Sequence, residues 1–332
     1  MFRITSLTEI SDRQLDRLVR RVAAILLIGL IAFVGFYVLD RWRVPATPMI
    51  DQRTASLEAA VRADPADIAS RGQLADLYTA AARYPEAIAQ YDAILGTGKE
   101  DELAHFGRGT ALRASGDLPG ATVDFQAVVD IAKGGEMAHV DPMLNAAYFG
   151  LGAIALEQGR PKDAVAHLLA AVEIKRSDAD ALNLLGSAYL KAGEPAKAIE
   201  PLKRAIAFVP LGWTEPYTTL ARAYQATGDP ARSEWAGAMA DLSSGDAMGA
   251  KARLLAISDG DAALEAAIGL GLVSETLGDD AAAADWYGKA LAIDPANAEA
   301  RLGVGRVSTP DVTTTPLPDL PKPGQLEGGQ GS

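Results

Sequence analysis

Cysteine is absent from this chain, and histidine, aromatic and basic residues are scarce. Its 332 residues include no Cys and three His, and 6% are aromatic. The lack of Cys excludes a disulfide framework and thiolate chemistry with metals or redox partners. Asp and Glu number 43 against 31 for Lys and Arg, which gives a formal net charge of -12. Because nucleic acid phosphates require a basic face, we expect no nucleic-acid partner.

Motifs for catalysis and for cofactor binding are also missing. His105, His139 and His167 are far apart in the sequence, and none belongs to an H-E-x-x-H motif. His139 and Asp141 are close enough to contact one metal ion, but a solvated loop pair is the simpler interpretation. No phosphate-binding or dinucleotide-binding glycine motif follows a predicted strand. We therefore predict no catalytic residue, metal site, cofactor or small-molecule substrate, and we do not expect an enzyme.

Long apolar runs are missing except for one near the amino end. Residues 22–39 (VAAILLIGLIAFVGFYVL) contain no charged side chain, and a helix of that length nearly spans a bilayer core at about 1.5 Å per residue. A buried core helix and a cleaved signal peptide are the alternatives. The run is apolar on every face, which disfavours the first, and longer than a usual signal-peptide core, which disfavours the second. We interpret it as a single transmembrane anchor.

Arginine is more frequent before this segment than after it. Five Arg lie within residues 1–21, and three follow within residues 40–53. The positive-inside rule then keeps residues 1–21 in the cytoplasm and places the rest of the chain on the periplasmic or extracellular side. The prolines of residues 40–51 predict a short extended spacer behind the anchor.

One sequence occurs twice at an offset of 34 residues. Each copy has apolar residues at three- and four-residue spacing, a Gly that ends a first helix and a Pro that opens a second. Each copy is therefore predicted to form an antiparallel pair of helices. The matching residues are Leu151 and Leu185, Gly152 and Gly186, Gly159 and Gly193, Pro161 and Pro195, Ala164 and Ala198, Leu168 and Leu202, and Ala171 and Ala205.

This period closely resembles the tetratricopeptide repeat (TPR). The residues that match its signature are Gly186, Tyr189, Gly193, Ala198, Ala205 and Pro210. The resemblance implies an all-α, right-handed superhelical solenoid, because one helix pair cannot bury its apolar face and must stack on its neighbours. Weaker copies extend the pattern over residues 52–307. Residues 308–332 are rich in Pro and Gly and are predicted to be disordered.

Two stretches depart from the 34-residue period, and a third, in the tail, carries a separate motif. Residues 133–141 are an insertion, and residues 228–278 exceed one period by enough for one extra helix. Within the latter, residues 234–242 and 248–257 both have a helical pattern, and either one fits as the partner of the preceding helix. In the tail, residues 318–321 fit a P-x-x-P pattern, for which chance is the simpler explanation in so Pro-rich a segment.

By resemblance to TPR proteins, the first helix of each pair lines a concave groove that binds an extended peptide or a partner helix. The residues placed in this groove are Phe106, Thr110, Arg113, Phe149, Ala153, Asn183, Ser187, Leu190, Arg222 and Gln225. Packing between neighbouring repeats is the alternative role for Phe106 and Phe149. Some family members bind a terminal carboxylate through a lysine, but Gly72, Phe106 and Phe149 occupy that position here. The resemblance therefore does not support an adaptor for chaperone tails.

These observations predict a membrane-tethered protein-interaction scaffold or assembly factor with a protein or peptide partner. Envelope biogenesis, secretion and cytochrome c maturation are the candidate processes, since the start of the repeat region is similar in style to repeat domains of cytochrome c maturation subunits. A regulatory or signalling subunit whose repeats sense a partner is the alternative. The short segment before the anchor has too few residues for a catalytic or DNA-binding domain, which favours the scaffold.

Overall fold

The computed structural model describes residues 49–98 and 102–308. Within these two stretches, no helix has the length and the apolar character that crossing a membrane requires. The predicted anchor at residues 22–39 lies outside them, and so does the predicted tail apart from Ser308, the last residue of the final helix. Both therefore stay predictions.

Every regular element in the described residues is helical. The α-helices are α2 (Met49–Ala63), α3 (Ile68–Ala80), α4 (Tyr84–Leu95), α5 (Glu102–Ser115), α6 (Leu118–Ala132), α7 (Pro142–Glu157), α8 (Pro161–Ile174), α9 (Ala179–Lys191), α10 (Pro195–Phe208), α11 (Thr214–Thr227), α12 (Pro230–Ser243), α13 (Ala247–Ala256), α14 (Ala263–Thr276), α15 (Asp280–Ile293) and α16 (Ala298–Ser308). A short 3-10 turn, η2 (Ala138–Val140), lies between α6 and α7.

Local sequence signals account for many of the helix ends. Pro occupies a first-turn position in α7, α8, α10 and α12, where its missing N–H costs no hydrogen bond. In many helices an Asp side chain accepts a hydrogen bond from a first-turn N–H that has no partner within the helix. These Asp residues are Asp67, Asp117, Asp141, Asp178, Asp229, Asp246 and Asp279. α11 ends at Gly228, whose φ of 81° is a left-handed conformation that Gly adopts without strain.

Residues 49–90 form a first compact unit that contains α2, α3 and the start of α4. α2 packs against α3, and the Tyr78 hydroxyl donates a 2.8 Å hydrogen bond to the Glu58 carboxylate. Because α2 begins at Met49, it corrects the extended conformation expected up to residue 51. The physical reason is that no Pro or Gly occurs between Pro48 and Pro65, and a Pro directly before a helix does not prevent its start.

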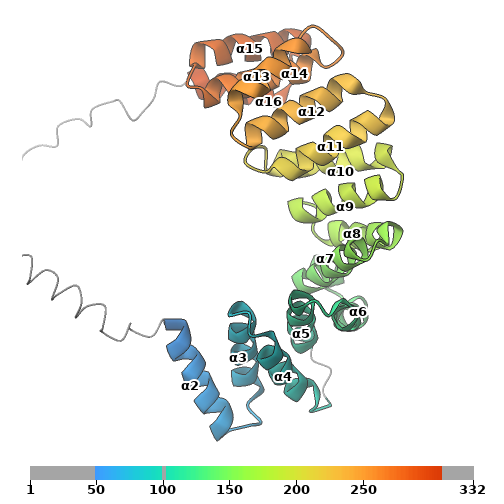
Figure 1. Ribbon diagram of the computed structural model, residues 1–332, viewed down its shortest axis with the longest axis vertical. Helices are drawn as coiled ribbons and strands as arrows, with labels where there is room; N and C mark the ends of the chain where they lie inside the picture. Colours follow the sequence, from blue (N-terminus) through green and yellow to red (C-terminus); the bar gives the residue numbers. More distant parts are fainter. Residues whose placement is uncertain (1–48, 99–101, 309–332) are drawn as a thin grey trace, which may run out of the picture. The chain divides into compact units, whose positions relative to one another are not determined.

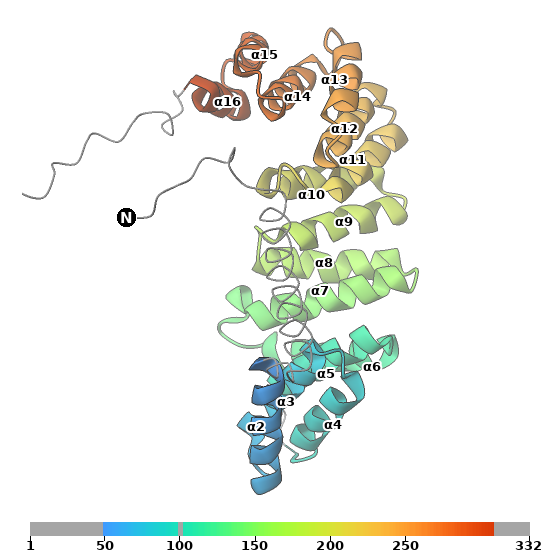
Figure 2. The same ribbon diagram turned by 60° about the vertical axis from the view of Figure 1, so that its left-hand side comes forward.

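Residues 91–308 form a second compact unit in which successive helices pair and stack. The pairs are α5–α6, α7–α8, α9–α10, α11–α12 and α14–α15, and each follows the previous one along the unit in Figures 1 and 2. Buried residues of neighbouring pairs share apolar clusters, such as the one that contains Leu202, Leu220 and Leu254. The predicted all-α helical repeat array is therefore confirmed.

The two long departures from the period are accommodated as a connection and as an extra helix. Residues 133–141 connect α6 to α7 and contain η2. In residues 228–278, α12 is the helix that pairs with α11, while α13 is an additional helix of ten residues that packs against both α12 and α14. The pairing that the sequence left open is thus determined.

Two glycines one period apart allow close approach within their helix pairs. A Cβ atom on Gly152 would lie 2.5 Å from the Leu168 side chain, and one on Gly186 would lie 2.4 Å from Leu202. Both leucines are fully buried. The doubled stretch therefore builds the same contact in α7–α8 and in α9–α10.

Candidate functional site

Four of the predicted groove residues line one hollow between the first two helix pairs of the second unit. Phe106, Thr110 and Arg113 lie on α5 at helical spacing, and Phe149 lies on α7. The hollow has a volume of about 400 Å³. We call it the Phe pocket, and its lining residues are Phe106, Thr110, Arg113, Ala114, Phe125, Ala146, Phe149, Gly150 and Glu157.

Three phenylalanines give the Phe pocket an apolar wall. The rings of Phe106 and Phe125 are tilted, with centroids 5.9 Å apart. Phe125 is buried, and it approaches the backbone of α7 closely because a Cβ atom on Gly150 would lie 2.7 Å from its ring. Phe106 and Phe149 are only half-buried and also pack against the cores of adjacent repeats. The packing role that the sequence left open for both residues is therefore present, and their role in binding a partner stays a prediction.

The rim of the Phe pocket is polar. Arg113 Nη2 lies 2.8 Å from Glu157 Oε1, and both side chains keep solvent access. The Thr110 hydroxyl donates a 2.9 Å hydrogen bond to the Phe106 carbonyl. An apolar hollow with a few polar groups at its edge suits a large apolar side chain whose attached backbone reaches the rim.

A buried carboxylate holds α5 against α6 and so positions the wall of the Phe pocket. Asp124 accepts hydrogen bonds from Arg108 at 2.7 and 2.8 Å and lies 2.8 Å from His105 Nδ1. Its side chain is 1% exposed. The hydrogen bonds to Asp124 raise the pKa of the Arg108 guanidinium. The only sequence signal was His105 and Arg108 three residues apart on one helix face, which does not identify their partner on α6.

The remaining predicted groove residues fall into two groups. Ala153 and Asn183 are buried, at 5% and 2% exposure, so they offer almost no surface to a partner and correct that part of the prediction. Ser187 and Leu190 on α9 are partly buried, whereas Arg222 and Gln225 on α11 are exposed. None of these six residues lines the Phe pocket.

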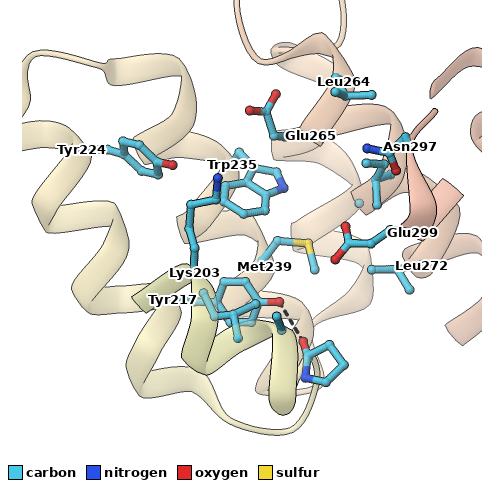
Figure 3. A pocket seen from close by; sticks show the side chains of 15 residues that line it. Lys203, Tyr217, Tyr224, Trp235, Met239, Leu264, Glu265, Leu272, Asn297 and Glu299 are labelled. Carbon is cyan, nitrogen blue, oxygen red and sulfur yellow. Dashed lines mark hydrogen bonds between the residues drawn. The ribbon is translucent and has the colours of Figure 1, made fainter. Parts of the chain in front are cut away.

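Sequence reasoning missed a second hollow region nearer the carboxyl end. It consists of two adjoining hollows of about 240 and 530 Å³, lined by residues of α10 to α12 and of α14 to α16. Tyr217 and Trp235 meet edge to face in the first one, with ring centroids 6.2 Å apart, and the Tyr217 hydroxyl donates to the Pro210 carbonyl at 2.7 Å (Figure 3). We call the two hollows together the Trp235 cleft. It lies where the repeat register was uncertain, and no local motif indicates it.

The side chains of the Phe pocket and of the Trp235 cleft were also compared with the requirements of a metal site. In residues 49–98 and 102–308, no group of three or more His, Cys, Asp or Glu side chains is arranged to hold a metal ion. The polar groups of the Phe pocket are a guanidinium, a carboxylate and a hydroxyl that are engaged with one another or with the backbone. This arrangement is suited to recognition of a partner.

Comparison with known proteins identifies the repeat. Models of the tetratricopeptide repeat match residues 73–136, 143–210 and 264–297, which together make up half of the chain. No curated protein matches the sequence.

Several solved structures are similar to this chain. The C-terminal part of a TPR repeat-containing protein from Cytophaga hutchinsonii has a TM-score of 0.50 and 18% identity, covering 77% of this chain and 94% of its own. YrrB, described as a TPR protein with an unusual peptide-binding site, has a TM-score of 0.49 and 18% identity over 58% of this chain and 95% of its own. A MamA protein has a TM-score of 0.48 and 20% identity over 55% and 93%. At such identities the likeness concerns the fold alone.

Proposed function

We propose that this chain, which belongs to the tetratricopeptide repeat family, is a membrane-tethered scaffold that binds a partner protein through the Phe pocket. The family's fold is one of protein-interaction scaffolds. The observation that carries the assignment to this pocket is that Phe106, Thr110, Arg113 and Phe149, placed in the groove by sequence, line a single hollow. The ligand is a peptide segment that inserts a large apolar side chain among the phenylalanines.

The chemistry of the pocket supports this kind of ligand. Of the four phenylalanines in the described residues, three line the Phe pocket. Aromatic anchors in a hollow commonly dominate the binding energy of an interface, while the polar rim fixes orientation. Arg113 and Glu157 remain accessible as a pair, so peptide amide or carboxyl groups have a donor and an acceptor within reach.

The membrane tether is the second part of the proposal. It rests on the uncharged run at residues 22–39 and on the excess of Arg before it. Residues 1–21 then lie in the cytoplasm, and the repeats face partners on the periplasmic or extracellular side. Envelope biogenesis, secretion and cytochrome c maturation are processes that use such a scaffold.

Filling the Phe pocket tests the binding function without removing any core contact. Thr110 is exposed at the pocket, so Thr110→Trp should occupy the hollow. Peptides selected from a random displayed library against the full chain should share a large apolar anchor, and they should bind Thr110→Trp at least about tenfold more weakly. Thr218→Trp is the matched control, because Thr218 is exposed on α11 and lines neither hollow. Selected peptides that bind both variants equally would refute the assignment.

A further inference from the structure

The connection between α10 and α11 is apolar where the corresponding connections are polar. Residues 208–211 read FVPL, and all four side chains are exposed. The connections that lead into α3, α9 and α16 read DPAD, KRSD and DPAN. Single exposed apolar residues are normal on a protein surface. In the part of the chain that the structure describes, however, only residues 208–211 bring three exposed large apolar side chains into four consecutive positions.

The same connection lacks the helix cap that its counterparts have. Asp67, Asp178 and Asn297 each precede a helix and accept a hydrogen bond from a first-turn N–H, at 3.0, 3.1 and 3.0 Å. α11 is instead preceded by Trp213, whose side chain makes no such bond. An apolar residue at a capping position costs stability. Because sequences tend to break such local rules at functional sites, the apolar connection points to a binding role.

This connection is anchored to the helix that follows it. The Pro210 carbonyl accepts a 2.7 Å hydrogen bond from the hydroxyl of buried Tyr217, and the ring of Pro210 fixes one backbone dihedral. Gly212 takes a left-handed φ of 80°, which Gly adopts without strain. Apolar side chains that are positioned before a partner arrives lose less entropy on binding.

The connection also forms one wall of the larger hollow of the Trp235 cleft. Pro210 and Leu211 line this hollow of about 530 Å³, and exposed Leu302 of α16 lines it as well. Glu299, one turn before Leu302 on α16, lines the same hollow. Side chains three residues apart on a helix lie about 5–6 Å from each other on one face. The hollow therefore combines exposed apolar side chains with a carboxylate one helical turn away.

Glu299 carries the charge of this hollow that has no counter-ion. The other charged lining residues, Glu275 and Arg306, form an ion pair with each other at 2.7 Å. Within residues 49–98 and 102–308, the Glu299 carboxylate accepts no hydrogen bond and forms no ion pair. Figure 3 shows Lys203 on the opposite side of the adjoining smaller hollow, which Glu299 also lines. Charge complementarity then favours a ligand that carries a cation beside an apolar side chain.

We propose that residues 208–211 and the larger hollow of the Trp235 cleft form a docking surface for an amphipathic helix of a partner protein. The helix places a large apolar side chain against Leu211 and Leu302. A Lys or Arg three or four residues away on the same helix face pairs with Glu299. Amphipathic helices commonly bind by laying their apolar face into a hollow of this kind. Because this surface shares no lining residue with the Phe pocket, it is a second and separate site.

A displayed library of amphipathic helices, randomised along one face, tests this surface in the full-length chain. Helices are selected on the unaltered protein and counter-selected on a variant with Leu211→Ser and Leu302→Ser, which are exposed positions. An unchanged melting temperature verifies that the variant is folded. The recovered helices should share a large apolar anchor with Lys or Arg three or four residues away, and should bind the variant at least about tenfold more weakly. Failure to recover any helix would overturn the proposal, as would recovered helices without the cation.

Glu299→Gln separates the proposed contact from the ordinary role of an acidic residue in a first helical turn. Glu215 provides the matched control, because both side chains are exposed and lie in the first turn of their helices, but Glu215 lines neither hollow. Glu299→Gln should weaken binding of the selected helices about fivefold, as loss of one partly exposed ion pair does, whereas Glu215→Gln should change it less than about twofold. Equal effects of the two substitutions would contradict the assignment of Glu299.

Two further measurements distinguish other sites and other occupants. Thr110→Trp, which fills the Phe pocket, should leave the affinity of these helices unchanged, and a loss of binding would place them in the Phe pocket and refute the second site. Sedimentation of the full-length chain in detergent should show no dimer that Leu211→Ser with Leu302→Ser dissociates. Such a dimer would overturn the proposal and assign the surface to a second copy of this chain.

Discussion

At the scale of single residues, the buried carboxylate of Asp124 contacts two side chains of α5, the helix that carries part of the Phe pocket wall. Asp124→Ala leaves the Arg108 guanidinium and the His105 ring without their shared carboxylate. Breaking a buried ion pair costs about 3–5 kcal/mol, and because Arg108 keeps 24% of its side chain exposed we expect a loss of about 2–4 kcal/mol in the free energy of unfolding. Urea denaturation of residues 49–308, followed by circular dichroism, measures it.

The matched control is the other carboxylate that contacts the same guanidinium. Asp92 lies 2.6 Å from Arg108 Nη1, but its side chain is 54% exposed. Asp92→Ala should therefore cost only about 0.2–1 kcal/mol, as exposed ion pairs do. Similar losses for the two variants would show that the burial of Asp124 does not increase its contribution to the free energy of unfolding.

Glu275 should make stability depend on pH in the acidic range. Burial raises the pKa of its carboxyl, but hydrogen bonds from Arg306 and Tyr287 outweigh burial and hold the pKa below its ordinary value of 4.5. A lowered pKa in the folded state means that the stabilisation is complete above the unfolded pKa and is lost as pH falls through the folded one. The free energy of unfolding of Glu275→Gln should thus be lower than that of the parent near pH 7, and this difference should shrink towards about pH 3. Urea denaturation at several pH values measures it, and a difference that does not change with pH contradicts the assignment.

At the scale of helices, the close approach of α9 and α10 depends on Gly186. A side chain there collides with fully buried Leu202, since even a Cβ would lie 2.4 Å from it. Gly186→Leu should lower the free energy of unfolding by about 1–3 kcal/mol, the usual cost of overpacking. Gly288→Ala is the control, because Gly288 lies exposed in α15 and an added Cβ meets nothing within 4 Å.

That control should move stability in the opposite direction. Ala is favoured over Gly in a helix interior by about 0.8–1 kcal/mol, so Gly288→Ala should raise the melting temperature. Thermal melts followed by circular dichroism compare both variants. An unchanged melting temperature for Gly186→Leu would show that α9 and α10 separate easily.

The helices that the sequence predicted well are those whose starts and close contacts are marked by residues of the same repeat. Pro161 and Pro195 at helix starts, and the glycines one period apart, specify α7 to α10 almost completely. α13 is different, because the helical patterns on both sides of the connection at residues 244–246 are equally compatible with pairing to α11. What distinguishes them is tertiary packing, since α12 packs against α11, whereas α13 packs against α12 and α14.

In the candidate sites too, the sequence predicted which residues share a helix face but not which residues distant packing buries or brings together. Phe106, Thr110 and Arg113 lie on one helix face by their spacing alone, so sequence placed them together. Asn183 was placed in the groove by its position in the repeat, but burial at 2% exposure follows from the particular side chains packed around it. The Trp235 cleft combines residues of α10, α11, α12, α14, α15 and α16, and no short motif carries that information.

At the scale of the whole molecule, the proposed function depends on which side of a membrane the repeats occupy. Five Arg within residues 1–21 against three within residues 40–53 favour a cytoplasmic amino end. With an amino-terminal epitope tag and the protein expressed in a bacterial host, protease added to spheroplasts should digest the repeats and leave the tag protected.

Arg17→Glu, Arg20→Glu and Arg21→Glu together reverse the charge bias and should expose the tag in part of the molecules. The control is Arg41→Ala with Arg43→Ala, which strengthens the original bias and should leave the protease pattern unchanged. Full protection of the repeats in the unaltered chain would reverse the orientation and place the partner of the Phe pocket in the cytoplasm.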